Sequence, residues 1–227
     1  MRAAIIPARG GSKRIPRKNV REFCGKPMIA WSINAALESE CFDQVVVSTD
    51  DDEIAEVAVQ YGADTPFMRP EELADDYATT GQVMSHAVKK LLEQYNNLSS
   101  VCCLYATAPF VSSEDLQSAA NQLEAGDADF VFSATSFPFP TQRAIRLDEN
   151  LRVEMLHPEH LLTRSQDLEE TYHDAGQFYW GRPSAFLEQR SFFSKRSEAF
   201  LIPRHRVQDI DTPEDWILAE LMLKALA

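Results

Sequence analysis

The sequence predicts an α/β fold built on a largely parallel sheet with helices on both faces. Short apolar runs alternate with segments whose apolar residues recur at helical spacing, which is the order of strand–helix units. A glycine-rich loop follows the first run. The run at 44–48 is almost continuously apolar, as in a strand buried on both faces. Ligands of such folds bind at the carboxyl ends of the strands.

The elements follow one another along the chain. We expect strands at 2–7, 44–48, 100–105 and 129–134, an extended segment at 205–210, and helices at 27–37, 49–61, 79–94, 113–125 and from 212 onward. Pro27 suits the first turn of its helix, and Gly62 suits the end of the next one. Thr212 as N-cap, followed by Pro213 and an acid three residues on, starts the last helix.

Residues 136–182 interrupt this regular order. They are rich in proline, aromatic and charged residues and follow no clear period. We interpret the segment as a substrate-binding or dimerisation insertion within one domain spanning 1–227, because 227 residues are too few for two ordinary domains.

The composition argues against several classes of protein. The net charge of −13 disfavours general nucleic-acid binding, which needs a basic surface. No apolar stretch approaches the ~20 residues that span a bilayer, and the start, broken by Pro7, is not a signal peptide. Four cysteines form no CxxC pair, and the adjacent Cys102 and Cys103 face opposite ways on a strand. We therefore expect a cytoplasmic protein with reduced thiols and with no nucleic-acid or membrane partner.

Positive charge is concentrated at the N-terminus. Residues 1–26 hold eight basic groups and one acid, whereas the other 201 residues hold 14 basic and 34 acidic groups. A local excess of positive charge on an acidic protein suits a small polyanion such as a nucleoside triphosphate.

The loop PARGGSKRIPRKN at 7–19 carries most of this charge. Gly10 and Gly11 allow backbone amides to approach an anion, and Ser12 adds a hydroxyl donor. Arg9 and Lys18 can place cations on the β- and γ-phosphates. The loop matches neither GxxxxGK[ST] nor GxGxxG, which excludes the P-loop and dinucleotide motifs. The alternative is a solvated basic turn.

Two carboxylates near the C-terminus form a candidate metal site. Asp209 and Asp211 are two residues apart on an extended segment, so both side chains project from one face. Two hard oxygen ligands that face a triphosphate suit Mg²⁺. The alternative is that Asp211 only helps to start the following helix.

The sequence resembles the nucleotide-sugar cytidylyltransferases that activate sialic acids and related nonulosonates. The shared motifs occur in the same order, as IPARGGSK at 6–13, PRKN at 16–19, FCGKP at 23–27, VSTDD at 47–51, RPEELADD at 69–76 and QDIDTPED at 208–215. The resemblance covers nearly the whole chain. It implies a homodimeric enzyme with a Rossmann-like fold that uses CTP and Mg²⁺.

The resemblance also implies which residues form the nucleotide site. The triphosphate is expected at Ala8, Arg9, Gly10, Gly11, Ser12, Lys18 and Asn19, and the cytidine or its phosphates at Arg69, Asp76 and Thr80. Asp209 and Asp211 stand where members of the family hold the metal. Arg9, Lys18 and these two aspartates are then the expected catalytic residues.

Within the family, the second half of the chain resembles the enzymes that act on pseudaminic acid. FPFPTQR at 137–143, RSQDLE at 164–169 and YHDAGQFYWG at 172–181 carry this resemblance. Sialic acid enzymes commonly have a Pro-Asn-Gly-like segment where this chain has residues 174–176, and often a Gln where it has Ala106.

The same stretches offer candidate sugar ligands, namely Gln142, Arg143, Arg164, His173, Asp174 and Gln177. A guanidinium suits the carboxylate of the sugar, although Arg143 and Arg164 can equally be surface ion pairs. His173 and Gln177 can read acetamido groups. His173 is also a candidate general base, since the unperturbed pKa of histidine is ~6.5, or else a hydrogen-bonded structural residue.

Together these features predict a reaction. The anomeric hydroxyl of a nine-carbon acidic sugar, expected to be pseudaminic acid, attacks the α-phosphorus of CTP, and pyrophosphate leaves. One alternative is a cytidylyltransferase for N-acetylneuraminic, legionaminic or 3-deoxy-octulosonic acid. The other is a nucleotide-binding module that has lost catalysis.

Overall fold

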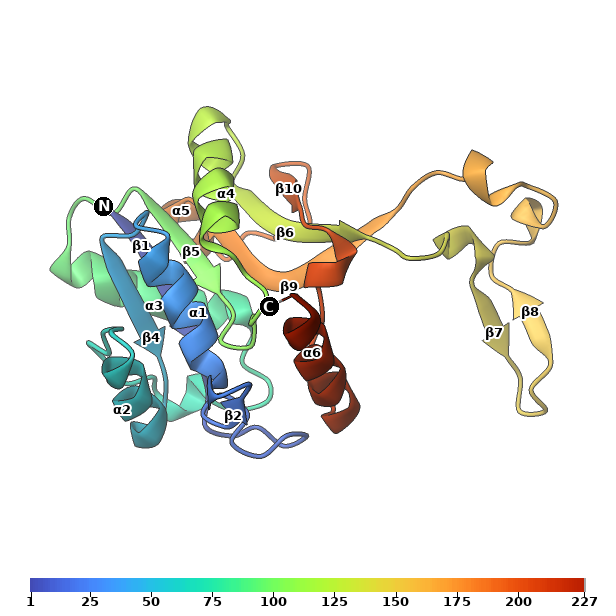
Figure 1. Ribbon diagram of the computed structural model, residues 1–227. Helices are drawn as coiled ribbons and strands as arrows, with labels where there is room; N and C mark the ends of the chain where they lie inside the picture. The colour runs from blue at the N-terminus through green and yellow to red at the C-terminus, as the bar shows by residue number, and fades with distance from the viewer. Residues whose placement is uncertain (227) are drawn as a thin grey trace.

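The computed structural model describes residues 1–226 and centres on a sheet in the order β10-β6-β9-β5-β1-β4 (Figure 1). The strands are β1 (Arg2–Pro7), β4 (Gln44–Ser48), β5 (Ser100–Leu104), β6 (Phe130–Ser136), β9 (Tyr172–Gly181) and β10 (Ser197–Leu201). β1 pairs in parallel with β4 and β5, and β10 pairs in parallel with β6. β9 runs antiparallel to both neighbours. The largely parallel sheet is therefore confirmed, with one antiparallel strand near its centre.

Helices cover both faces of the sheet, as predicted (Figure 1). One face is covered by α1 (Met28–Glu38), α2 (Asp52–Gln60) and α4 (Ser113–Ala125), and the other by α3 (Thr80–Gln94) and α5 (Pro183–Leu187). Successive strand residues alternate between the two layers of core, because side chains alternate along a strand. Cys102 packs in the first layer and Cys103 in the second, and all four cysteines are free thiols.

The helix ends follow local signals in the sequence. Asp51 is the N-cap of α2, since its Oδ1 accepts a hydrogen bond from the Ile54 amide at 3.0 Å. Thr212 and Asp215 cap the last helix reciprocally: Thr212 Oγ1 accepts from the Asp215 amide at 3.2 Å, and Asp215 Oδ2 accepts from the Thr212 amide at 2.7 Å. The predicted start of that helix is confirmed.

The last helix, α6 (Pro213–Leu226), packs beside the loop that follows β1. The rings of Trp216 and Phe23 meet edge to face with centroids 5.2 Å apart, in an apolar cluster that also contains Ile15 of the loop. Two ends of the chain are thereby fixed against each other. Lys18 reaches across this junction and donates to the Ile210 carbonyl at 2.7 Å.

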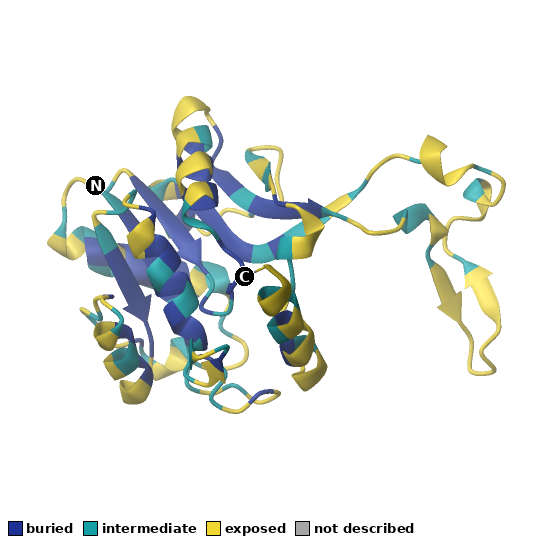
Figure 2. Ribbon diagram, viewed as in Figure 1, coloured by how far each residue is buried: buried dark blue, intermediate teal, exposed yellow. Residues whose placement is uncertain are grey.

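The segment 136–182 differs from the prediction because it consists of two unlike parts. Residues 137–171 form an arm that projects from the sheet and ends in the hairpin of β7 (Ile145–Leu147) and β8 (Val153–Met155) (Figure 1). Residues 172–181 instead form β9, between β5 and β6. The aromatic run FYWG at 178–181 is buried, as Figure 2 shows for this strand, so it belongs to the core.

Some smaller elements lie outside the predictions. These are β10, α5 and the two-residue strands β2 (Glu22–Phe23) and β3 (Lys26–Pro27). The segment predicted as extended at 205–210 begins with a 3₁₀ turn, Arg204–Arg206. No helix among residues 1–226 is long and apolar enough to cross a membrane.

Candidate active site

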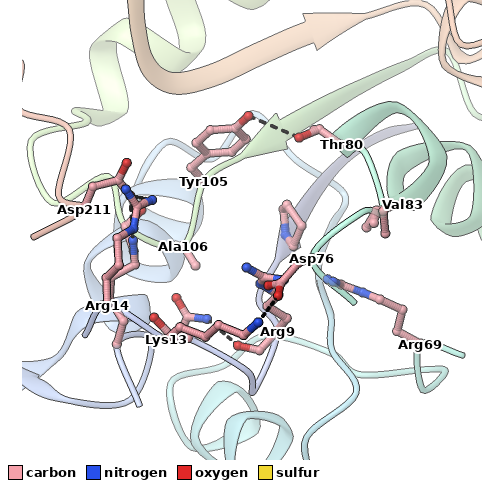
Figure 3. Close-up of a pocket in the computed structure, with 16 residues that line it drawn as sticks. Arg9, Lys13, Arg14, Arg69, Asp76, Thr80, Val83, Tyr105, Ala106 and Asp211 are labelled. Atoms are coloured by element: carbon pink, nitrogen blue, oxygen red, sulfur yellow. Dashed lines mark hydrogen bonds and ion pairs between the residues drawn. The ribbon is translucent and has the colours of Figure 1, made fainter. Parts of the chain in front are cut away.

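A cavity of about 650 Å³ opens at the carboxyl ends of β1 and β5, where the fold is expected to bind a ligand (Figure 3). The cavity brings together many of the residues predicted for the nucleotide and the metal. Those that line it are Arg9, Ser12, Lys18, Asn19, Arg69, Asp76, Thr80 and Asp211. Ala8, Gly10 and Gly11 belong to the same loop but are not among the lining residues within 1–226. The loop is thus the wall of a cavity and not a freely solvated turn.

The phosphate loop is tied to the end of β4 and the start of α2. The Ala8 amide donates to the Ser48 carbonyl at 3.0 Å, and the Gly10 amide donates to Asp50 Oδ1 at 3.1 Å. A Cβ on Gly10 would lie 2.5 Å from Asp51 Oδ2, so only glycine fits there without displacing this aspartate. Glycine is therefore required at position 10 because the loop passes close to a carboxylate of the protein itself. Gly11 has open space around its Cα.

Four cations of the loop are held by two carboxylates at the cavity. Asp76 pairs with Arg9 at 2.8 Å and with Lys13, and these two cations hold the pKa of its carboxyl below the usual range, with Lys13 the larger cause. Asp211 pairs with Arg14 at 2.9 Å and Lys18 at 3.5 Å. Four cations thus converge on one cavity, in a protein whose net charge is −13. Such a cluster focuses positive potential where an anionic ligand enters.

Arg69 is the buried cation of the site, with only 6% of the residue exposed. Its Nε donates to Ser48 Oγ at 3.3 Å, its Nη2 donates to the Ser48 carbonyl, and its amide donates to the Thr49 carbonyl at 2.7 Å. Burial lowers the pKa of the guanidinium to about 10, which leaves it protonated at neutral pH. Arg69 therefore fixes the floor of the cavity at the end of β4.

Asp211 lines the cavity, whereas Asp209, the other predicted metal ligand, is not among the lining residues within 1–226. The cap of α6 is made by Thr212 and Asp215, so the Asp211 carboxylate is free to contact Arg14 and Lys18 instead of starting the helix. Loss of hydration, and then the charge of Asp211, raises the pKa of Asp209. A cation bound near both carboxylates would offset the part of this shift that comes from the charge of Asp211.

The predicted sugar ligands fall into two groups, and none of them lines this cavity within residues 1–226. Arg143 and Arg164 lie on the arm. Arg143 donates to the Leu161 and Thr163 carbonyls, and Arg164 pairs with Asp167 at 2.6 Å. Gln142, also on the arm, donates to the Glu169 carbonyl at 3.0 Å.

The second group lies on β9, whose end pairs with β5 next to the cavity. His173 Nδ1 lies 2.8 Å from the Asp174 carbonyl. Gln177 is buried, and its Nε2 donates to the Arg206 carbonyl at 2.6 Å. Its Oε1 has no hydrogen-bond partner among the described residues. Asp174 accepts a hydrogen bond from the Tyr179 hydroxyl.

Further residues that the sequence did not single out as ligands also line the cavity, among them Lys13, Arg14 and Tyr105. Lys13 and Arg14 belong to the basic loop, and Tyr105 follows directly on β5. The rule that ligands bind at the carboxyl ends of parallel strands would have pointed to Tyr105, because β5 is the neighbour of β1.

A sequence model of one protein family, described as Cytidylyltransferase, matches residues 3–215. The chain belongs to this family. It is therefore a nucleotidyltransferase, and the cavity with its cations is the candidate active site of this cytidylyltransferase.

Named relatives agree with the family assignment. Over 220 residues the chain is 49% identical to the pseudaminic acid cytidylyltransferase of Campylobacter jejuni subsp. jejuni (serotype O:2), which covers 97% of this chain and 95% of that protein. It is 38% identical to the CMP-N,N'-diacetyllegionaminic acid synthase of Legionella pneumophila subsp. pneumophila, with coverage of 97% and 95%. A solved CMP:2-keto-3-deoxy-manno-octonic acid synthetase in complex with CTP superposes with a TM-score of 0.72 at 15% identity, covering 100% and 99% of the two chains. This likeness confirms the Rossmann-like fold.

Proposed function

We propose that the enzyme transfers CMP from CTP to pseudaminic acid and releases pyrophosphate. The observation that carries the proposal is the convergence of Arg9, Lys18, Arg69 and Asp211 on one cavity, in a chain that is 49% identical over 97% of its length to an enzyme named for this substrate. The relative named for the legionaminic acid derivative is less similar, at 38% identity. The sugar follows the more similar relative.

The chemistry is one displacement at phosphorus. The anomeric oxygen of the sugar forms a bond to the α-phosphorus of CTP, and the bond from this phosphorus to the bridging oxygen breaks. Pyrophosphate takes the electron pair of that bond, and the hydroxyl proton passes to solvent. Cations near the leaving group stabilise the charge that develops on pyrophosphate. Arg9, Lys13, Arg14 and Lys18 are positioned for this role by Asp76 and Asp211.

The carboxylates at the cavity suit Mg²⁺. Asp209 and Asp211 offer hard oxygen ligands. Burial is the largest cause of the raised pKa of Asp209, and the charge of Asp211 is the second cause, which a divalent cation would offset. Among residues 1–226, no group of three or more His, Cys, Asp or Glu side chains is placed to coordinate a metal ion together. We propose that the ion is held by these two carboxylates and by the phosphates of the substrate. When bound, Mg²⁺ would neutralise charge on the phosphate oxygens.

We also propose that the enzyme is a homodimer formed through the arm. The arm exposes many large apolar side chains, at Phe139, Ile145, Leu147, Leu151, Val153, Leu156, Leu161 and Leu162. Leu162 is 93% exposed and Phe139 is 78% exposed. Soluble monomers rarely expose contiguous apolar surface of this kind, and self-association is the commonest way to cover it. Arg143 and Arg164 lie on the same arm, so they would approach a sugar bound to the second copy.

A cytoplasmic location agrees with this function, because CTP is an intracellular metabolite and the four free thiols suit a reducing compartment.

The function is tested by measuring pyrophosphate release from CTP and Mg²⁺ with pseudaminic, legionaminic, N-acetylneuraminic and 3-deoxy-octulosonic acids. We expect the highest kcat/KM with pseudaminic acid, and little turnover when UTP or ATP replaces CTP. Equal turnover of a second sugar would refute the sugar assignment and leave the cytidylyltransferase intact. No release with any sugar would refute the proposed reaction.

The metal and the dimer have separate tests. Asp209→Asn and Asp211→Asn are expected to lower kcat by orders of magnitude without unfolding the protein, whereas Glu214→Gln, an exposed acid at the start of α6, serves as the control. Leu162→Glu on the arm is expected to yield monomers in analytical ultracentrifugation. Val59→Glu is its control, because Val59 is 58% exposed on α2, outside the arm.

A further inference from the structure

β9 contains a bulge that changes which of its side chains meet. The pairing of β9 with β6 shifts register in the middle of β6, and Gly176 adopts a left-handed conformation with φ 63°. Ser133 Oγ accepts hydrogen bonds from the backbone amides of Gln177 and Phe178, both at 3.2 Å. The bulge is therefore fixed by the neighbouring strand.

The bulge brings Asp174 to Tyr179. In a regular strand, residues five apart point to opposite faces and lie about 17 Å from each other. Here the Tyr179 hydroxyl donates to Asp174 Oδ2, while Asp174 Oδ1 accepts from the Gly176 amide at 2.8 Å. Both oxygens of the carboxylate are thus engaged within β9. Asp174 is not among the described residues that line the cavity.

Tyr179 in turn supports a residue that does line the cavity. Its ring lies against that of Tyr105, with centroids 5.4 Å apart and planes inclined by 48°. The Tyr105 hydroxyl lies 3.3 Å from Thr80 Oγ1 at the start of α3, a contact drawn in Figure 3. A continuous set of contacts therefore runs from the carboxylate of Asp174, through two tyrosines, to the wall of the active site.

The raised pKa values of the two tyrosines keep both hydroxyls protonated at neutral pH, so that both can donate hydrogen bonds. Burial raises the pKa of Tyr105 to about 12. Burial, followed by the neighbouring Tyr105 and Asp174, raises the pKa of Tyr179 still further above its usual range. Tyr179 is 3% exposed, and a buried tyrosine whose hydroxyl is hydrogen-bonded to a carboxylate has one preferred orientation.

We propose that Asp174 is a positioning residue for the acceptor sugar, which acts by holding Tyr179 against Tyr105 and does not bind the sugar itself. Tyr105 lines the cavity between Thr80, on the nucleotide side, and Asp211, on the side of the loop cations (Figure 3). In this proposal the acceptor sugar lies beside Tyr105, whose hydroxyl is a neutral hydrogen-bonding group on the wall of the cavity. This proposal rests on the proposed function for the identity of the acceptor.

A double-mutant cycle between Asp174→Ala and Tyr179→Phe tests the proposal. Tyr179→Phe removes only the hydroxyl and keeps the buried ring, so it is the conservative member of the pair. Each single variant is expected to lower kcat/KM for the sugar by about tenfold, which is the effect of losing one hydrogen bond to a charged group. KM for CTP is expected to stay within about twofold, because the loop cations are untouched. The double variant is expected to be no worse than the worse single variant.

Additive losses in the double variant would mean that Asp174 contacts the sugar directly, and would overturn the proposal. Thermal unfolding of each variant separates positioning from a general loss of stability. A crystal structure of Tyr179→Phe provides a readout that does not depend on turnover. We expect the Tyr105 hydroxyl to leave Thr80 in that structure, and an unmoved Tyr105 would overturn the proposal. If the wild-type enzyme released no pyrophosphate with any of the sugars, the proposed function would instead be refuted.

Discussion

Replacement of Asp51 by alanine is expected to weaken both the fold and the phosphate loop. Asp51 caps α2 through the Ile54 amide, and its carboxylate forms a two-point ion pair with Arg17, at 2.5 and 2.9 Å. Loss of an N-cap costs about 1 kcal/mol. A partly exposed ion pair adds roughly 0.2–1 kcal/mol. We therefore expect the free energy of unfolding to fall by about 1–2 kcal/mol.

For a chain of this length, each kcal/mol lowers Tm by about 2–4 °C, so Asp51→Ala is expected to lower Tm by roughly 2–8 °C. Asp51→Asn is the matched control, because asparagine caps a helix as well as aspartate but cannot pair with Arg17 as a charge. Asp51→Asn is expected to retain most of the stability that Asp51→Ala loses. KM for CTP is expected to rise more in Asp51→Ala, because Asp51 also packs against Gly10 of the loop. Differential scanning calorimetry at one protein concentration measures the first effect, and pyrophosphate release measures the second. Identical Tm values for the two variants would refute the capping argument.

Three further predictions concern packing and charge. Gly10→Ala is expected to lower Tm and raise KM for CTP, because the new Cβ would lie 2.5 Å from Asp51 Oδ2, whereas Gly11→Ala, with open space, is expected to keep the wild-type Tm. Gly181→Ala is expected to lower the free energy of unfolding by about 1–3 kcal/mol, as measured by urea denaturation, because its Cβ would lie 2.7 and 2.8 Å from atoms of two buried phenylalanine rings. Asp129 is almost fully buried, and its two arginine partners hold the pKa of its carboxyl below the usual range. A carboxyl whose pKa is lower in the folded protein than in the unfolded chain stabilises the fold above about pH 4, and this stabilisation is lost as the pH falls further. Urea titrations of Asp129→Asn should therefore show a lower free energy of unfolding than the wild type at pH 7. Below pH 4 the free energy of unfolding of the variant should decline less steeply.

The phosphate-loop part of the predicted site is encoded locally. The cations of the phosphate loop lie within ten residues of one another, directly after an obvious strand, so their convergence needs no knowledge of distant pairing. Asp211 was recognised by its motif, and the structure brings it to Lys18 although the two are far apart in the chain. The pairing of Arg9 and Lys13 with Asp76 was not predicted, because it depends on how residues 69–80 fold back over the loop.

The middle of the chain was harder to predict for a different reason. The period of a strand is the main signal for its existence, and β9 loses that period at its bulge, near Gly176. The aromatic residues of β9 suit a binding surface as well as a core. They are buried because β9 pairs with β5 and β6, and this pairing cannot be read from the sequence of β9 alone. The sequence separates the arm from the regular part of the chain, but the predicted segment ends at residue 182, eleven residues beyond the end of the arm at 171.

The position of β9 also determines when this sheet can close during synthesis. β5 and β6 do not pair with each other, because β9 lies between them. A nascent chain that has left the ribosome as far as the arm therefore has one group of paired strands, β4, β1 and β5, and the single strand β6, and both have unpaired edges. Such edges are open to pairing with other chains. The pairing of Gly181 with Val101 closes a loop of about 80 residues, and contacts of this sequence separation form slowly. The enzyme thus depends on a late step of folding, when residues 172–181 enter the sheet and set the tyrosine that supports its active site.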